Sequence, residues 1–127
     1  MEAAIPKRIL IVDDEEDIAS GTTEMLRRAG YDAAFTINGD EALTMIASFR
    51  PDLVILDINM PNVNGGYIAA RLAENPDTVQ IPVIMLSALV SRPEEYFENR
   101  GNNKRYMMSK PASREDLIKR IESMLSD

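Results

Sequence analysis

Residues 51–57 read Pro-Asp-Leu-Val-Ile-Leu-Asp, a short apolar run that follows a proline and ends on a carboxylate. Comparable runs, nearly continuous in apolar residues, recur at residues 8–12, 32–35, 81–86 and 106–109. Strands without polar alternation are buried on both faces, as in a parallel sheet that helices cover on both sides. The run at 51–57 therefore predicts a buried strand, and the five runs together predict a five-stranded sheet.

The segments between these runs carry the apolar spacing of helices. Ile18, Met25 and Leu26 fall on one helix face, and Asn38 and Ser113 are typical helix N-caps. Strands that alternate with helices indicate right-handed crossovers and a parallel sheet. The pattern predicts a doubly wound α/β fold with five helices.

Residues 91–104 form the weakest of the five helical segments. They offer only Tyr96 and Phe97 as large apolar anchors, and then read Gly-Asn-Asn at 101–103. We therefore expect a short or mobile helix in this segment.

The composition excludes several kinds of chemistry. The chain has 127 residues, 14 Lys and Arg against 21 Asp and Glu, a formal net charge of −7, and neither His nor Cys. Serine–histidine triads, thiol nucleophiles, disulfides and Cys/His zinc sites are therefore excluded within this chain. The length predicts one domain over residues 1–127, with no output domain. The negative charge argues against binding to nucleic acid or anionic membranes. We expect a soluble, cytoplasmic protein, because no apolar run is long enough to span a membrane.

Unusual polar residues stand at the carboxyl ends of four predicted strands: Asp13 and Asp14, Asp57, Ser87, and Lys110. Ligands of open parallel sheets bind beyond these strand ends. Any one of these residues is most simply a helix cap or a solvated strand end. Their joint arrival at one edge of one sheet favours a functional site.

The charges of this cluster indicate what it binds. Two carboxylates about 5 Å apart repel by roughly 3 kcal/mol at an effective dielectric of about 20. Three Asp and one Lys sum to −2, which a single Mg²⁺ would neutralise, and oxygen ligands suit Mg²⁺. A carboxylate beside Mg²⁺, a Lys and a hydroxyl can receive a phosphoryl group by in-line attack. The added charge can then draw Ser87 inward, which is the physical basis of a switch.

Four blocks of this sequence resemble, in order and spacing, the motifs of response-regulator receiver domains, the chemotaxis-regulator-like modules of two-component signalling. The blocks are Ile-Leu-Ile-Val-Asp-Asp-Glu at 9–15, Pro-Asp-Leu-Val-Ile-Leu-Asp-Ile-Asn-Met-Pro at 51–61 with Gly65, Ser87-Ala88 and Lys110-Pro111. The resemblance covers essentially the whole chain. It implies a flavodoxin-like fold with strand order 2-1-3-4-5.

The resemblance also implies a role for each matching residue. Asp57 would be the phosphoacceptor, and Asp13 and Asp14 would hold Mg²⁺ together with Asp57 and the main-chain carbonyl of Asn59. Lys110 would supply the cation that contacts the phosphoryl group.

The same resemblance implies switch and tuning positions. Ser87 would be the hydroxyl that follows the phosphoryl group, and Ala88 the small residue that leaves room for it. Leu89 and Asn59 would border the phosphoryl group and tune the access of water. Met107 stands where the family usually has an aromatic residue, and Tyr106 lies one residue earlier, on the opposite face of the strand.

Residues 15–17, Glu-Glu-Asp, extend the acidic pair at 13–14. Acidic residues in the first turn of a helix complement its dipole. We therefore interpret Glu15 as a helix-start residue rather than as part of the site.

The leading hypothesis is a phosphorylation-controlled binding module. Its donor would be a phosphohistidine on a sensor histidine kinase or a histidine phosphotransfer protein, since this chain has no His. Its output would be contact with a downstream protein, as a monomer or weak dimer. It would catalyse nothing beyond its own phosphorylation and dephosphorylation at Asp57.

Two alternatives compete with this hypothesis. A Mg²⁺-dependent aspartyl-phosphate phosphatase of the haloacid-dehalogenase type places its nucleophile after the first strand, with a second Asp two residues later. Here the candidate follows the third strand, and Asn59 stands two residues later. An unphosphorylated scaffold is the other alternative, and the presence of all five polar residues argues against it.

Overall fold

The computed structural model describes residues 5–58, 65–88, 97–100, 103–110 and 112–126. Its strands are β1 (Arg8–Val12), β2 (Asp32–Thr36), β3 (Leu53–Asp57), β4 (Val83–Ser87), β5 (Phe97–Arg100) and β6 (Asn103–Ser109). Its helices are α1 (Glu16–Arg28), α2 (Gly39–Phe49), α3 (Gly65–Glu74) and α4 (Arg114–Leu125).

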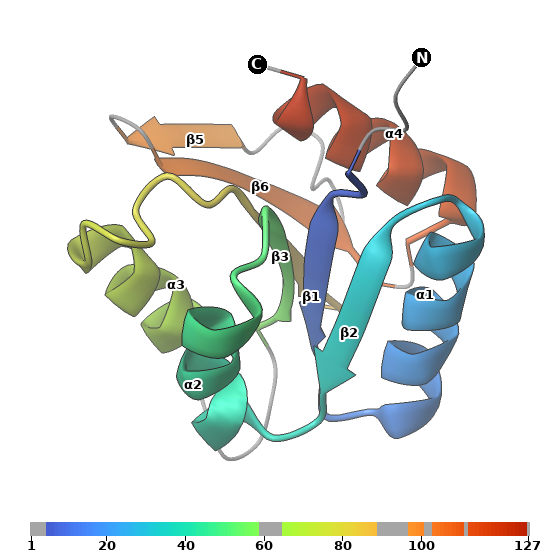
Figure 1. The fold of residues 1–127 in the computed structure, drawn as a ribbon, viewed down its shortest axis with the longest axis horizontal. Coiled ribbons are helices and arrows are strands. Elements are labelled where there is room, and N and C mark those ends of the chain that lie inside the picture. The colour runs from blue at the N-terminus through green and yellow to red at the C-terminus, as the bar shows by residue number, and fades with distance from the viewer. Residues whose placement is uncertain (1–4, 59–64, 89–96, 101–102, 111, 127) are drawn as a thin grey trace.

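The strands form one sheet in the order β2-β1-β3-β4-β6-β5 (Figure 1). All pairings from β2 to β6 are parallel. The predicted parallel sheet with strand order 2-1-3-4-5 is therefore confirmed, with β6 in the place of the fifth strand. Every residue of β3 and β4 is buried, as their unbroken apolar sequence predicts.

The prediction of a helix within residues 91–104 is wrong for the part that the structure describes. There, residues 97–100 form β5, which pairs antiparallel with β6 at the edge of the sheet. The described residues thus contain four helices rather than five. With few apolar residues this segment lacks the apolar stripe that holds a helix on a sheet. Main-chain pairing with β6 needs no such stripe.

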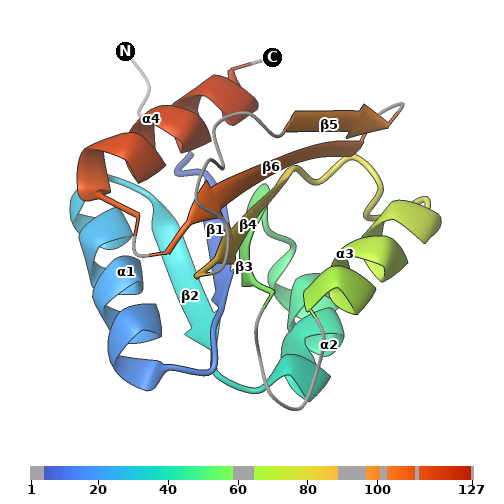
Figure 2. The same cartoon turned by 180° about the vertical axis from the view of Figure 1, so that it is seen from behind.

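Two helices cover each face of the sheet (Figures 1 and 2). Helices α1 and α4 pack on one face, where Leu26 and Ile121 are fully buried against Ile9 and Ile55. Helices α2 and α3 pack on the other face with Ile46 and Leu72. These two apolar layers hold the strands in register and so determine where the strand ends lie.

The predicted helix caps at Asn38 and Ser113 are confirmed. The Asn38 side chain accepts a hydrogen bond from the main-chain N–H of Asp40 at 2.9 Å, and the Ser113 hydroxyl accepts one from that of Asp116 at 3.1 Å. Helix α1 starts differently, because its N-cap Glu15 makes no side-chain capping bond. None of the described helices combines the length and apolar character that crossing a membrane requires.

Candidate functional site

The pairing of β1 with β3 brings two predicted site residues together. Val12 lies opposite Leu56 in the register, so the residues that follow them, Asp13 and Asp57, lie next to each other at the carboxyl ends of β1 and β3. Their exposed fractions are 1% and 2%. The main-chain N–H of Asp13 donates to the carbonyl of Thr36 at 3.1 Å, which anchors this strand end to β2. Two buried carboxylates therefore share one edge of the sheet.

Lys110 enters this edge from β6. Its main-chain N–H donates to the Ser87 carbonyl at 3.0 Å, which extends the β4–β6 ladder beyond Ser109. The Lys110 Nζ lies 3.0 Å from Asp57 Oδ2, 3.1 Å from Asp13 Oδ2 and 2.8 Å from Glu15 Oε1. One ammonium group therefore bridges three carboxylates that come from two strand ends and a helix start.

Burial and these ion pairs act on the pKa values in opposite directions. Burial lowers the pKa of Lys110, but hydrogen bonds to Glu15, Asp57 and Asp13 outweigh it and leave the pKa above its ordinary value. For Asp13, burial raises the pKa, and the Glu15 N–H and Lys110 only partly offset this. Lys110 therefore stays charged at neutral pH, while the charge on Asp13 is poorly compensated.

The acidic residues can hold a hard cation. Carboxylate oxygens of Asp13, Asp14, Glu15 and Asp57 all lie within 4.8 Å of one another. Asp13 Oδ2 is buried and accepts no hydrogen bond from the described residues, although it lies near the Lys110 ammonium. Four carboxylates and one ammonium sum to −3. This donor set of oxygens with excess negative charge fits Mg²⁺.

Ser87 is the remaining residue that the sequence placed at this edge. It ends β4, is 2% exposed, and follows Leu86, whose register partner on β3 is Asp57. Ala88, the next residue, is exposed. The structure thus brings Asp13, Asp57, Ser87 and Lys110 to one edge, with Asp14 in the carboxylate cluster. Asn59 and Leu89 lie outside the described residues.

Comparison with known proteins shows the family to which the chain belongs. The sequence profile of the response regulator receiver domain matches residues 9–122. The chain belongs to the response regulator receiver family. The polar-differentiation response regulator DivK of Brucella anthropi is 33% identical over 123 residues, which are 97% of this chain and 99% of DivK.

Other relatives of this receiver domain are longer than the chain. The DNA-binding response regulator MtrA of Mycolicibacterium smegmatis is 33% identical over 119 residues, which are 94% of this chain but only 50% of MtrA. The fold also matches the crystal structure of a CheY-like response regulator receiver domain protein from Methanospirillum hungatei JF-1. That match has a TM-score of 0.81 and 25% identity, and covers 96% of this chain and 95% of the other.

Tyr106 and Met107, two of the switch candidates, lie on opposite faces of β6, as their alternation along the strand predicts. Tyr106 is buried in the apolar layer beneath α4, while Met107 packs partly buried against the layer of α2 and α3. The Arg120 guanidinium of α4 lies 3.7 Å from the centroid of the Tyr106 ring. The Tyr106 ring therefore contacts α4, on the opposite face of β6 from Met107.

Glu15 is the site residue that the sequence analysis missed. We interpreted it as a helix-start acid, but its carboxylate contacts Lys110 Nζ and joins the carboxylate cluster. Its position directly after the acidic pair was the available signal. The contact depends on Lys110, 95 residues away, so local sequence could not reveal it.

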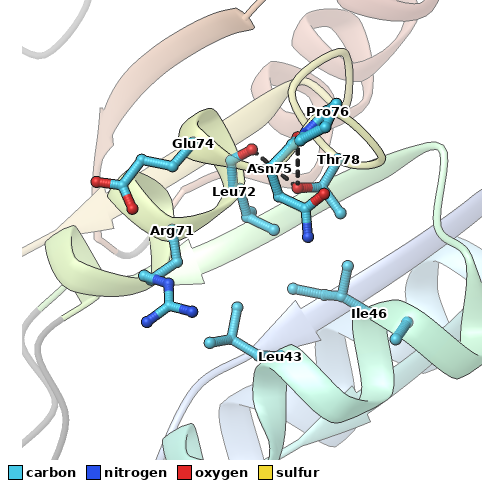
Figure 3. A pocket seen from close by; sticks show the side chains of 9 residues that line it. Leu43, Ile46, Arg71, Leu72, Glu74, Asn75, Pro76 and Thr78 are labelled. Atoms are coloured by element: carbon cyan, nitrogen blue, oxygen red, sulfur yellow. Dashed lines mark hydrogen bonds between the residues drawn. The ribbon is translucent and has the colours of Figure 1, made fainter.

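A groove of about 450 Å³ lies away from this chemistry, between α2 and α3. Leu43 and Ile46 of α2 face Arg71 and Leu72 of α3 across it (Figure 3). No residue of the carboxylate cluster lines this groove. The candidate site residues of the receiver domain therefore lie apart from this groove, at the carboxyl edge of the sheet.

Proposed function

We propose that this receiver domain takes a phosphoryl group onto Asp57 from a phosphohistidine on a sensor histidine kinase or a histidine phosphotransfer protein. The observation that carries the proposal is the placement of Asp57, a carboxylate 2% exposed whose Oδ2 lies 3.0 Å from an ammonium group. Family membership supports it, because the chain is a receiver domain of two-component signalling.

The transfer is a displacement at phosphorus. A carboxylate oxygen of Asp57 forms the new O–P bond while the N–P bond of the phosphohistidine breaks. The electron pair of that bond stays on the imidazole nitrogen of the donor. Lys110, which already lies beside Asp57, would stabilise the negative charge on the phosphoryl oxygens.

Asp13, Asp14 and Asp57, with the main-chain carbonyl of Asn59, would hold Mg²⁺ at this site. When bound, the ion would neutralise charge on the transferring phosphoryl oxygens. The clustered carboxylate oxygens and the unbonded Asp13 Oδ2 support this part of the proposal. Lys110 can neutralise only one of the four acidic charges.

The consequence of phosphorylation would be a change in protein contacts. A phosphoryl group adds negative charge and hydrogen-bond acceptors next to the buried Ser87. Movement of Ser87 and Ala88 toward these acceptors would alter the surface that a downstream protein binds. We propose no catalysis by this chain beyond phosphorylation and dephosphorylation of Asp57. Membership of the receiver family does not favour a haloacid-dehalogenase-like phosphatase.

Phosphoramidate labelling tests this proposal. The protein is incubated with phosphoramidate and Mg²⁺, and intact mass and lability to hydroxylamine are then measured. We expect one hydroxylamine-labile phosphoryl group that is absent from Asp57→Asn and absent when a chelator replaces Mg²⁺. Asp77→Asn, which changes an exposed acid on another surface, should label like the unmodified protein. Labelling of Asp57→Asn at the same stoichiometry would contradict the assignment.

A further inference from the structure

Among the described residues, Lys110 makes three ion-pair contacts, and the one with Glu15 is the shortest. The Glu15 Oε1 lies 2.8 Å from Nζ, against 3.0 Å for Asp57 and 3.1 Å for Asp13. The Glu15 side chain is 59% exposed, whereas those of Asp13 and Asp57 are each 2% exposed. The three carboxylates around the ammonium therefore differ in how easily they can return to water.

The hydrogen-bonding capacity of Lys110 is fully used in this arrangement. An ammonium group has three N–H donors. Nζ donates to Asp13 Oδ1 at 3.2 Å, to Glu15 Oε1 at 2.8 Å and to Asp57 Oδ2 at 3.0 Å. A phosphoryl group on Asp57 would bring additional oxygens to the same ammonium, while the Asp57 carboxylate itself becomes an acyl phosphate. The phosphoryl oxygens and the remaining carboxylates then compete for the three N–H donors.

Glu15 is the acceptor that can leave at the least cost. Asp13 and Asp57 are held at strand ends in a buried site, where water cannot readily take the place of the ammonium as their partner. The carboxylate of Glu15 stands on a longer, largely exposed side chain, and water can replace Lys110 as its partner.

We propose that Glu15 is an exchangeable counter-ion of Lys110 that competes with the phosphoryl group on Asp57 for the ammonium. This inference rests on the proposed function and assigns Glu15 a positioning role in it. The unphosphorylated state keeps Lys110 paired with Glu15, and in the phosphorylated state the phosphoryl oxygens compete with Glu15 for the ammonium. Glu15 thereby opposes the Lys110–phosphoryl contact while its negative charge favours Mg²⁺ at the same site.

These two effects have opposite signs, which makes the proposal testable with Glu15→Gln. The probes are Mg²⁺ alone and then beryllofluoride, which mimics an aspartyl-phosphate, at saturating Mg²⁺. Both are titrated into the full chain and followed by ¹H–¹⁵N NMR. For one partly exposed charge pair we expect Mg²⁺ to bind roughly two- to fivefold more weakly and beryllofluoride to bind roughly two- to fivefold more tightly.

Glu16→Gln is the matched control, because it removes the same charge from the next residue, which is exposed in the first turn of α1. It should change both affinities less than Glu15→Gln does. General damage to the site would weaken both ligands, so only the counter-ion role predicts opposite changes.

Beryllofluoride that binds Glu15→Gln no more tightly than Glu16→Gln would overturn the role of Glu15 and leave the assignment of Asp57 intact. An unmodified protein that binds Mg²⁺ but neither beryllofluoride nor a phosphoryl group would overturn both proposals.

Discussion

Lys110 Nζ donates a hydrogen bond to Asp57 Oδ2 at 3.0 Å, although 53 residues separate the two in the chain. Asp57 ends β3 and Lys110 follows β6, with β4 between these strands in the sheet. The side chains meet because parallel strands end at the same edge. This contact forms only after β3, β4 and β6 have paired, so it depends on the integrity of this part of the sheet.

Replacement of Lys110 by Met should destabilise the protein in a chelating buffer, because Asp13 and Asp57 would remain buried without their ammonium partner. Removal of one member of a buried ion pair costs about 3–5 kcal/mol. The free energy of unfolding in urea measures this cost. Lys119→Met, at an exposed position of α4, is the control and should change stability by less than about 0.5 kcal/mol. Equal losses in the two variants would contradict the buried ion pair.

Replacement of Asp13 by Asn should stabilise the protein in a chelating buffer. Burial raises the pKa of Asp13, which means that its charged form is unfavourable in the folded site. Asn can still accept the hydrogen bond that the Glu15 N–H donates to Oδ1 at 2.9 Å. Relief of repulsion between neighbouring carboxylates is worth on the order of 1–3 kcal/mol. Thermal denaturation should therefore show a higher Tm for Asp13→Asn than for the unmodified protein.

The same variant tests the metal site. Mg²⁺ that binds only the folded state raises Tm by mass action. The Tm of the unmodified protein should therefore rise at millimolar Mg²⁺, and the Tm of Asp13→Asn should rise less. An equal gain in both proteins would contradict a metal-binding role for Asp13.

The stability difference between the two proteins should depend on pH. The folded-state pKa of Asp13 lies above its ordinary value of 3.8, so the folded state binds this proton more tightly than the unfolded state does. Protonation of Asp13 therefore contributes to the free energy of unfolding. This contribution is fully present below pH 3.8 and is lost as pH rises through the folded-state pKa. In chelating buffer, the Tm advantage of Asp13→Asn should accordingly be small near pH 3.8 and grow toward neutral pH. An advantage that shrinks with rising pH would contradict the direction of the pKa shift.

Lys110 should add no pH dependence between neutral pH and about pH 9. Its pKa is raised above the ordinary value of 10.5, so the stability it contributes is present below that value and lost only at higher pH. A stability difference between the unmodified protein and Lys110→Met that falls between neutral pH and about pH 9 would contradict the ion pairs around the ammonium.

The contact between Arg120 and Tyr106 should couple α4 to β6. The guanidinium lies 3.7 Å from the ring centroid, and the ring is 6% exposed. A cation–π contact of this kind is worth about 0.5–2 kcal/mol. A double-mutant cycle with Arg120→Met and Tyr106→Leu should give a coupling energy in that range from urea denaturation. The same cycle with Lys119→Met in place of Arg120→Met should show no coupling.

Much of the fold was predictable from local patterns. Unbroken apolar runs marked β1, β3 and β4, because a strand that is buried on both faces can carry few polar residues. Asn38 and Ser113 marked helix starts, because their side chains satisfy main-chain donors nearby. Such features depend on neighbours within a few residues, so the sequence alone reveals them.

The edge of the sheet was predicted less well. Residues 97–100 pair with β6 as an antiparallel strand, where a weak helix was expected. A segment with few apolar residues carries no strong periodicity of its own. Its structure is then decided by the unpaired main-chain groups that β6 offers at the sheet edge.

That Asp13, Asp57, Ser87 and Lys110 share one edge could be predicted from their places in the chain, because parallel strands present all their carboxyl ends on the same side. The pairing of charges at that edge could not be predicted in this way, because it depends on the three-dimensional packing. The ammonium group of Lys110 forms ion pairs with Asp57, Asp13 and Glu15. The reach of a flexible side chain across the sheet depends on packing between distant strands, and no local spacing encodes it.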